Sequence, residues 1–213
     1  MSPSGQNNSD SVPEAKRPQS GLATASPTHR FTVDLARAET LAQMLASSRA
    51  AIAVEISDLL AGMYIYEWDR LSKYWSDPEP IEEFLRQICR ISPQRWHHWI
   101  EFYDENRKRT EPKHAWFLGS KSGESSSSKK KPLPWSSEVL DVLKRAEVIT
   151  PFHDKLDSGF VPILTSESML LSIALNLDSS VGQKLTETGL DLAGLQRDAR
   201  DKRRAPQDWR DEK

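Results

Sequence analysis

Apolar side chains recur at helical spacing through the first half of this chain. Between residues 34 and 48 they lie three or four positions apart, which is the spacing of one face of an amphipathic helix. These positions are Leu35, Ala38, Leu41, Ala42 and Leu45. We therefore expect the ordered part of the chain to begin near Phe31 and to open with a helix.

A second apolar stripe follows, again in steps of three or four residues, and it predicts one long helix of about 25 residues. Its members are Ile52, Ile56, Leu60, Tyr64, Trp68, Leu71 and Trp75. Gly62 lies inside this stripe, where we expect it to weaken the helix by about 1 kcal/mol relative to alanine.

Two proline-containing signals mark the start of the next helices. Asp77-Pro78 and Ser92-Pro93 each offer a side-chain oxygen that can cap a helix, followed by a residue with no amide hydrogen to satisfy. We expect these helices over about 79–89 and 92–106. With the preceding helices they would make residues 31–117 a compact helical domain.

This helix pair fits the pattern of a DNA-binding helix-turn-helix. That motif needs apolar residues at five set positions around a short turn, and the chain supplies Leu85, Cys89, Ile91, Trp96 and Trp99. Two positions depart from the pattern, because Arg86 replaces a small residue and Arg90 replaces the glycine that is usual in the turn. A plain helical hairpin with a tryptophan core is the competing interpretation.

On the helix-turn-helix register, the residues that face the DNA bases are Gln94, Arg95, His97 and His98. Gln can bind adenine and Arg can bind guanine through paired hydrogen bonds in the major groove. Just beyond them, Arg107, Lys108 and Arg109 could bind phosphates. Glu101, Asp104 and Glu105 lie near the same surface and would repel the DNA backbone.

The second half of the chain begins with a low-complexity linker at 118–134. It is rich in Ser and carries four lysines against one glutamate, which is typical of a flexible connection. Beyond it, Ser136 is placed to cap a helix over about 137–146, with Trp135 packing on Leu140 across the helix start.

Residues 135–204 are expected to form a smaller module of helices and a β-hairpin. Apolar residues at 148–149 and 160–164 flank a polar stretch and predict two short strands. Pro162 should confine its strand to a sheet edge. Further helices are predicted at about 166–177 and after Ser180, where Ser180 and Gln183 fit a capping box.

This order of helix, hairpin and helix also occurs in winged-helix units, although many small α+β domains share it. Three glycines, at 182, 189 and 194, indicate a frail C-terminal region that we expect to fray.

The expected fold class is therefore mainly α: a helical domain with a helix-turn-helix-like pair, a flexible linker, and a small helix-plus-hairpin module. The first 30 residues are rich in Ser, Pro, Gln, Asn and Gly. Such a segment buries too little apolar surface to offset its ordering entropy, so we expect a disordered tail at 1–30. Residues 205–213 should form a charged tail.

The net charge and the cysteine content of this 213-residue chain exclude several classes of protein. The formal net charge is −2, so the chain is not a polybasic protein. The lone Cys89 excludes a disulfide scaffold and the cysteine pairs of zinc fingers. The longest apolar stretch, 59–66, is far shorter than the roughly 20 residues of a spanning helix. With no visible secretory signal, we expect a cytoplasmic protein that does not enter the membrane.

The sequence contains no recognisable catalytic motif. Gly119 and Gly123 flank a lysine, but not in the order of a phosphate-binding loop. His97 and His98 are adjacent, so on a helix they point about 100° apart and cannot chelate one ion. The His153-Asp154 pair could contribute to a metal site, but it falls in an expected turn with no further metal-ligating residues nearby. We predict a non-enzymatic protein with no catalytic residue, no metal site and no cofactor.

Two functional hypotheses follow. The first is a DNA-binding regulatory or accessory protein that binds double-stranded DNA through the helix pair at about 79–107. The second is a helical protein–protein adaptor that binds a protein partner, or a second copy of itself, through an aromatic surface. The residues of that surface would be Tyr66, Tyr74 and Trp75, because exposed aromatic side chains often anchor protein interfaces.

Overall fold

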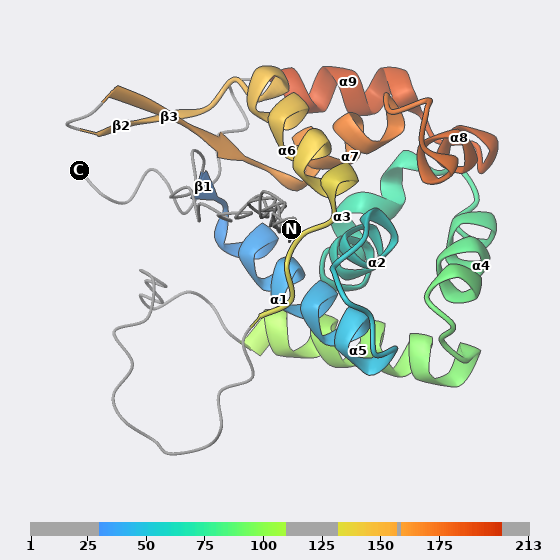
Figure 1. Cartoon of the computed structure of the whole chain (residues 1–213). Helices are drawn as coiled ribbons and strands as arrows, with labels where there is room; N and C mark the ends of the chain where they lie inside the picture. Colours follow the sequence, from blue (N-terminus) through green and yellow to red (C-terminus); the bar gives the residue numbers. More distant parts are fainter. Residues whose placement is uncertain (1–29, 110–131, 157–158, 202–213) are drawn as a thin grey trace, which may run out of the picture.

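The computed structural model describes residues 30–109, 132–156 and 159–201, and the side chains of 106–109 and 156 are not part of the description. It is mainly helical with a small three-stranded sheet, as the sequence predicts (Figure 1). In chain order the elements are β1 (Arg30–Phe31), α1 (Val33–Ser48), α2 (Ile56–Tyr66), α3 (Trp68–Leu71), the 3-10 turn η1 (Ser72–Tyr74), α4 (Glu79–Ile88), α5 (Pro93–Arg109), α6 (Ser137–Ile149), β2 (His153–Leu156), β3 (Gly159–Leu164), α7 (Ser166–Ala174), α8 (Ser180–Glu187) and α9 (Leu192–Arg200).

Helix α1 forms where its apolar stripe predicts. The Thr32 side chain caps it by accepting a hydrogen bond from the Leu35 amide at 3.3 Å. All five residues of the predicted stripe are buried, and α1 packs along α2. Gly62 lies at this contact: a Cβ atom there would stand 2.5 Å from the Ala38 carbonyl oxygen. The glycine therefore lets two helix backbones approach closely.

The single long helix expected over 52–75 is wrong. Ile52 is 91% exposed in the connection before α2, and α2 ends at Tyr66. Glu67 then leaves helical geometry, with φ −116° and ψ 34°, and α3 and η1 follow. Glu67 is fully buried and bonds to residues of α3 and α7, so the chain bends where its side chain meets these partners.

Both proline-containing signals precede a helix, but in α4 the N-cap position is taken by Pro78 rather than by Asp77. The Asp77 carboxylate accepts a hydrogen bond from the Glu79 amide at 3.0 Å, at the start of α4. The Ser92 hydroxyl accepts one from the Arg95 amide at 3.3 Å, at the start of α5. These bonds involve residues two or three positions apart, which is why the sequence alone indicated them.

A hairpin forms, but its first strand is not the predicted one, because Val148 and Ile149 end α6 and β2 instead contains His153 and Asp154, which were expected in a turn. The expectation that Pro162 lies on an edge strand is also wrong. Strand β3 is the middle strand, antiparallel to β2 and parallel to β1. β1 is only two residues long and pairs with β3 at Ile163 and Leu164. The proline thus precedes the part of β3 that β1 covers, and its missing amide hydrogen costs no bond to β1.

The C-terminal helices differ from the sequence prediction in detail. Ser136 caps α6 as expected, accepting from the Val139 amide at 3.3 Å; Trp135 is partly buried against the hydrophobic core, and Leu140 is 45% exposed. Ser179, not Ser180, caps α8. Every residue of α7 is buried, so α7 cannot enter a DNA groove as the recognition helix of a winged-helix unit would.

The C-terminal glycines occupy specific places in the packing. A Cβ atom on Gly182 would lie 2.2 Å from the Asn176 carbonyl oxygen, and Gly189 has a φ of +81°. The Asp191 carboxylate caps α9 by accepting from the Gly194 amide at 2.9 Å. Each glycine therefore fits a position where a side chain would clash or strain the backbone.

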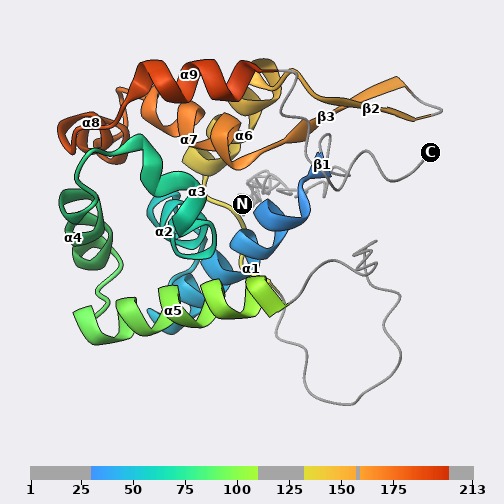
Figure 2. The ribbon, with the colours of Figure 1, turned by 180° about the vertical axis from the view of Figure 1, so that it is seen from behind.

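Residues on both sides of 110–131 share one hydrophobic core. Its main cluster takes buried residues from α1, α2, α4 and α5 and also from α6, α7, α8 and α9. Seen from both sides, α2 lies between α5 and the layer of α6, α7 and α9 (Figures 1 and 2). The end of the predicted linker is held against α1. The backbone amide and carbonyl of Leu133 each form a hydrogen bond with the side-chain amide of Gln43.

Several predictions fall outside the described residues. They are the tail at 1–29, the linker between 118 and 131, and the charged tail at 205–213. Within the part that the structure describes, no helix combines the length and apolar character needed to cross a membrane.

Replacing Gly62 with alanine should destabilise the protein, although alanine is the better helix former. The added Cβ meets the Ala38 carbonyl oxygen and the Ala42 amide nitrogen, so we expect the free energy of unfolding to fall by about 1–3 kcal/mol in urea denaturation. The control Met44→Ala, on the exposed side of α1, should change it little. A more stable Gly62→Ala protein would show that α1 and α2 are not in close contact.

Candidate nucleic-acid interface

The corner between α4 and α5 is built around a left-handed residue. Arg90 has a φ of +55°. Its amide donates to the Gln87 carbonyl at 3.2 Å, and the Ile91 amide donates to the Arg86 carbonyl at 2.8 Å. These two bonds are the Schellman pattern that ends many helices, usually with glycine in the position of Arg90. The turn glycine missing from the sequence pattern is thus replaced by an arginine in the same backbone conformation.

The apolar positions of the helix-turn-helix pattern hold this corner against the core. Leu85, Cys89 and Trp96 are buried, and Ile91 and Trp99 are partly buried against the same cluster. The Trp96 ring stacks on Tyr64 of α2 with ring centroids 6.1 Å apart. Because Trp96 is fully buried, it fixes which side of α5 faces inward.

Cys89 has no nucleophilic character in this environment. Its thiol lies near the Ser57 carbonyl oxygen, with Sγ and O 3.5 Å apart. Burial raises the pKa of the thiol to about 12, so the sulfur stays protonated at neutral pH.

The four predicted base-contact residues face outward. Gln94, Arg95, His97 and His98 are all exposed on the first two turns of α5. The Arg95 guanidinium lies over the Trp99 ring, 4.6 Å from its centroid, and the His97 Nδ1 atom is 2.7 Å from the Pro93 carbonyl oxygen. The structure therefore brings these side chains together on one exposed part of the helix.

The three predicted phosphate-contact residues are at the other end of the helix. Arg107, Lys108 and Arg109 form the last turn of α5, and their side chains lie outside the described residues. Twelve residues separate Arg95 from Arg107, which is roughly 18 Å along a helix axis. They are therefore not part of the α4–α5 corner itself.

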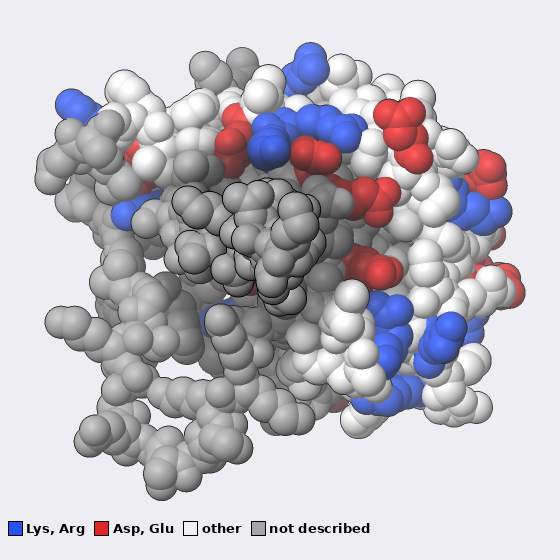
Figure 3. All heavy atoms as spheres, viewed as in Figure 1, with Lys and Arg blue, Asp and Glu red and all other residues white. Residues whose placement is uncertain are grey.

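The corner is basic although the chain as a whole is not. Residues 84–100 contain three arginines, two histidines and no Asp or Glu. The arginines are Arg86, Arg90 and Arg95, of which Arg90 and Arg95 are exposed. Figure 3 shows Lys and Arg side chains gathered over the place where α4 meets α5. We call residues 84–100 the basic corner.

The aromatic surface expected at Tyr66, Tyr74 and Trp75 does not exist. These side chains are 7%, 3% and 4% exposed. The Tyr74 hydroxyl donates to Asp198 of α9 at 2.9 Å, and Trp75 donates to the Thr188 hydroxyl at 3.0 Å. Tyr66 contacts Arg37 and Tyr103, whereas Tyr74 and Trp75 are covered by residues more than 100 positions later in the chain, which no local pattern could reveal. These three side chains therefore offer little exposed surface to a partner.

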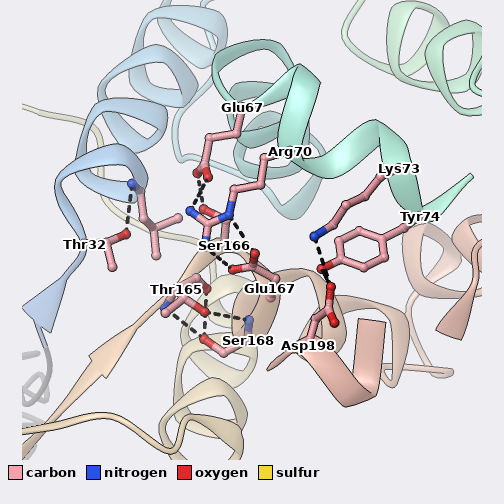
Figure 4. Close-up of polar contacts among 11 residues, drawn as sticks. Thr32, Glu67, Arg70, Lys73, Tyr74, Thr165, Ser166, Glu167, Ser168 and Asp198 are labelled. Atoms are coloured by element: carbon pink, nitrogen blue, oxygen red, sulfur yellow. Dashed lines mark hydrogen bonds and ion pairs between the residues drawn. The ribbon is translucent and has the colours of Figure 1, made fainter. Parts of the chain in front are cut away.

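A buried polar cluster, not anticipated from the sequence, lies where α3 meets α7 (Figure 4). Arg70 binds both oxygens of the Glu167 carboxylate at 2.7 Å and one oxygen of Glu67 at 3.1 Å. The other oxygen of Glu67 accepts from the Ser166 hydroxyl. Only the i,i+3 spacing of Glu67 and Arg70 was visible in the sequence, because Glu167 lies 97 residues beyond Arg70.

Histidine and carboxylate side chains do not converge on a metal-binding geometry in the described part of the chain. No group of three or more His, Cys, Asp or Glu residues there is placed to hold an ion. Asp154, of the His153-Asp154 pair, instead forms an ion pair with Arg30 across the sheet.

Comparison with known proteins adds no relative. No protein-family model matches the chain, and no curated protein matches it. The function is therefore inferred from the residues and geometry of the basic corner.

Substitutions at Arg90 should show whether the turn is left-handed. Arg90→Gly relieves the backbone strain of a φ of +55°, so we expect the free energy of unfolding to stay the same or rise by up to about 1 kcal/mol. Arg90→Val places a β-branched residue there and should lower it by about 1–2 kcal/mol. Equal destabilisation by both changes, measured by urea denaturation, would contradict this turn.

Proposed function

We propose that this chain is a DNA-binding regulatory or accessory protein that binds double-stranded DNA with the basic corner. One observation carries the proposal: Gln94, Arg95, His97 and His98 are exposed together at the start of α5, in a stretch of 17 residues without a carboxylate. A non-enzymatic role and a cytoplasmic location belong to the same proposal.

The start of α5 suits the major groove. An α-helix with its side chains is about 10–12 Å wide and the groove is about 12 Å wide. In helix-turn-helix proteins the first residues of the second helix contact the base edges. Here those turns carry the exposed polar residues, whereas Glu101 and Glu105 are exposed farther along α5. Their charges would repel phosphates, which favours insertion of the helix by its N-terminal end.

The side chains at this end have complementary roles in the proposed complex. Arg95 can bind guanine and Gln94 can bind adenine, each through two hydrogen bonds. The contact of Arg95 with the Trp99 ring holds the guanidinium in a limited range of positions before DNA arrives. Arg86 and Arg90, on the α4 side of the turn, would bind phosphates and contribute affinity that does not depend on sequence.

Fluorescence anisotropy of a labelled random-sequence duplex, titrated at several salt concentrations, tests this proposal. Arg90→Gly is the informative variant because it removes one charge while preserving the turn. If Arg90 neutralises one phosphate, the slope of log affinity against log salt should become about 0.9 less negative. The affinity at low salt should also fall.

Lys144→Ala is the matched control, since it also removes one positive charge. Its side chain is 74% exposed on α6, away from the basic corner, and its slope should equal that of the unchanged protein. If the affinity and the salt dependence fall equally in Arg90→Gly and Lys144→Ala, binding depends only on the net charge of the protein, and the basic corner is not the DNA-binding site. No binding at low salt would overturn the proposal.

Sequence readout needs a separate measurement. Selection of bound duplexes from a random pool should yield a preferred site for the unchanged protein, and Gln94→Ala with Arg95→Ala should lose the preference at two adjacent positions. Each correct base contact is worth about 1–3 kcal/mol of discrimination. If the double variant selects the same preferred site as the unchanged protein, Gln94 and Arg95 do not read bases.

A further inference from the structure

The bend between α2 and α3 holds a carboxylate that is closed off from water. Glu67 is 0% exposed. One of its oxygens accepts a hydrogen bond from the Ser166 hydroxyl at the start of α7, and the other is 3.1 Å from the Arg70 guanidinium (Figure 4). Its partners thus come from two segments that are far apart in the sequence and meet at this point.

Arg70 is shared unequally between two carboxylates. It reaches Glu167 through two parallel hydrogen bonds of 2.7 Å, from Nε and Nη2. This bidentate arrangement is the strongest form of such a pair. Glu67 receives a single, longer bond from the remaining side of the guanidinium. The positive charge of the Arg70 guanidinium therefore interacts mainly with Glu167.

Among the described residues, three charged side chains act on Glu67. They are Arg70 of α3, Glu167 of α7 and Asp34 of α1. Burial of Glu67, with the smaller repulsion from Asp34 and Glu167, outweighs the attraction of Arg70 and the hydrogen bond from Ser166, and raises the pKa of its carboxyl from the ordinary 4.5 to about 7. Binding a proton removes the buried charge of Glu67.

We propose that Glu67, Arg70, Ser166 and Glu167 form a proton-linked clamp, in which the folded protein holds a proton on Glu67 and loss of that proton destabilises the contact between α7 and the α2–α3 bend by leaving a buried charge in it. The Ser166 hydroxyl can partner both forms, since it donates to the carboxylate and can accept from the carboxylic acid. Arg70 keeps its pair with Glu167 in both states.

The direction of the pH effect follows from the raised pKa. Between about pH 4.5 and about pH 7 the folded chain holds a proton that the unfolded chain has released. The resulting stability is fully present below about pH 4.5 and is lost progressively as the pH rises to about 7. Above that value Glu67 is ionised in both states and contributes no further change.

Thermal unfolding of the full chain from about pH 5 to about pH 9 tests the clamp, with Glu67→Gln as the central variant. Glutamine matches the size of the protonated side chain and cannot ionise. We expect the Tm of the unchanged protein to fall by roughly 5–10 °C more than that of Glu67→Gln over this range. At the alkaline end, Glu67→Gln should be the more stable protein.

Glu167→Gln distinguishes the clamp from simple loss of an ion pair. Without Glu167, Arg70 is free to pair fully with Glu67, so the variant should have a lower Tm throughout and its pH-dependent fall should move to lower pH. Parallel Tm curves for the unchanged protein and Glu67→Gln would overturn the proposal.

Infrared spectroscopy gives a reading that does not depend on the stability of a variant. The folded protein at about pH 6 should show the carbonyl stretch of a protonated carboxylic acid, which should disappear as the pH rises through about 7. If no such band is present, Glu67 is ionised and the clamp does not exist. Where Glu67→Gln folds, the band should be missing from it.

Discussion

Helix α2 is buried along all eleven of its residues, and the rest of the structure is arranged to make this possible. Each end of the helix carries a fully buried carboxylate, Asp58 near the start and Glu67 just beyond the last turn. A buried carboxylate needs a charged partner or a bound proton, because its desolvation is otherwise prohibitive. Arg49, from the end of α1, pairs with Asp58, whereas Glu67, which the proposed clamp holds protonated, shares Arg70 with Glu167.

The same helix orients the surfaces on its two sides. Tyr64 of α2 stacks with Trp96 of α5, and this contact turns the opposite side of α5 toward solvent. Glu67 at the end of α2 meets Ser166 at the start of α7, which anchors the C-terminal helices. The proposed DNA contact and the proposed clamp thus lie on separate sides of one buried helix, so a change in one need not alter the chemistry of the other.

Local signals made most of the helices predictable, and distant contacts made the rest unpredictable. Asp77, Ser92 and Ser136 accept hydrogen bonds at helix starts from residues two or three positions away, so these helix starts were predictable from the sequence. The burial of Tyr74 depends on Asp198, 124 residues later, and no periodicity encodes that. The candidate DNA-facing residues were predictable from helical spacing alone, whereas the left-handed turn at Arg90 ran against the usual preference for glycine.

Native-state hydrogen exchange of the full chain, at increasing denaturant, tests most directly whether α2 joins both parts into one folding unit. If the shared core is organised around α2, the slowest amides of α2, α5 and α7 should exchange with the same free energy, through one global opening. If the slowest amides of α7 instead exchange through a separate opening of clearly lower free energy, residues 135–201 form an independent module and the account is contradicted.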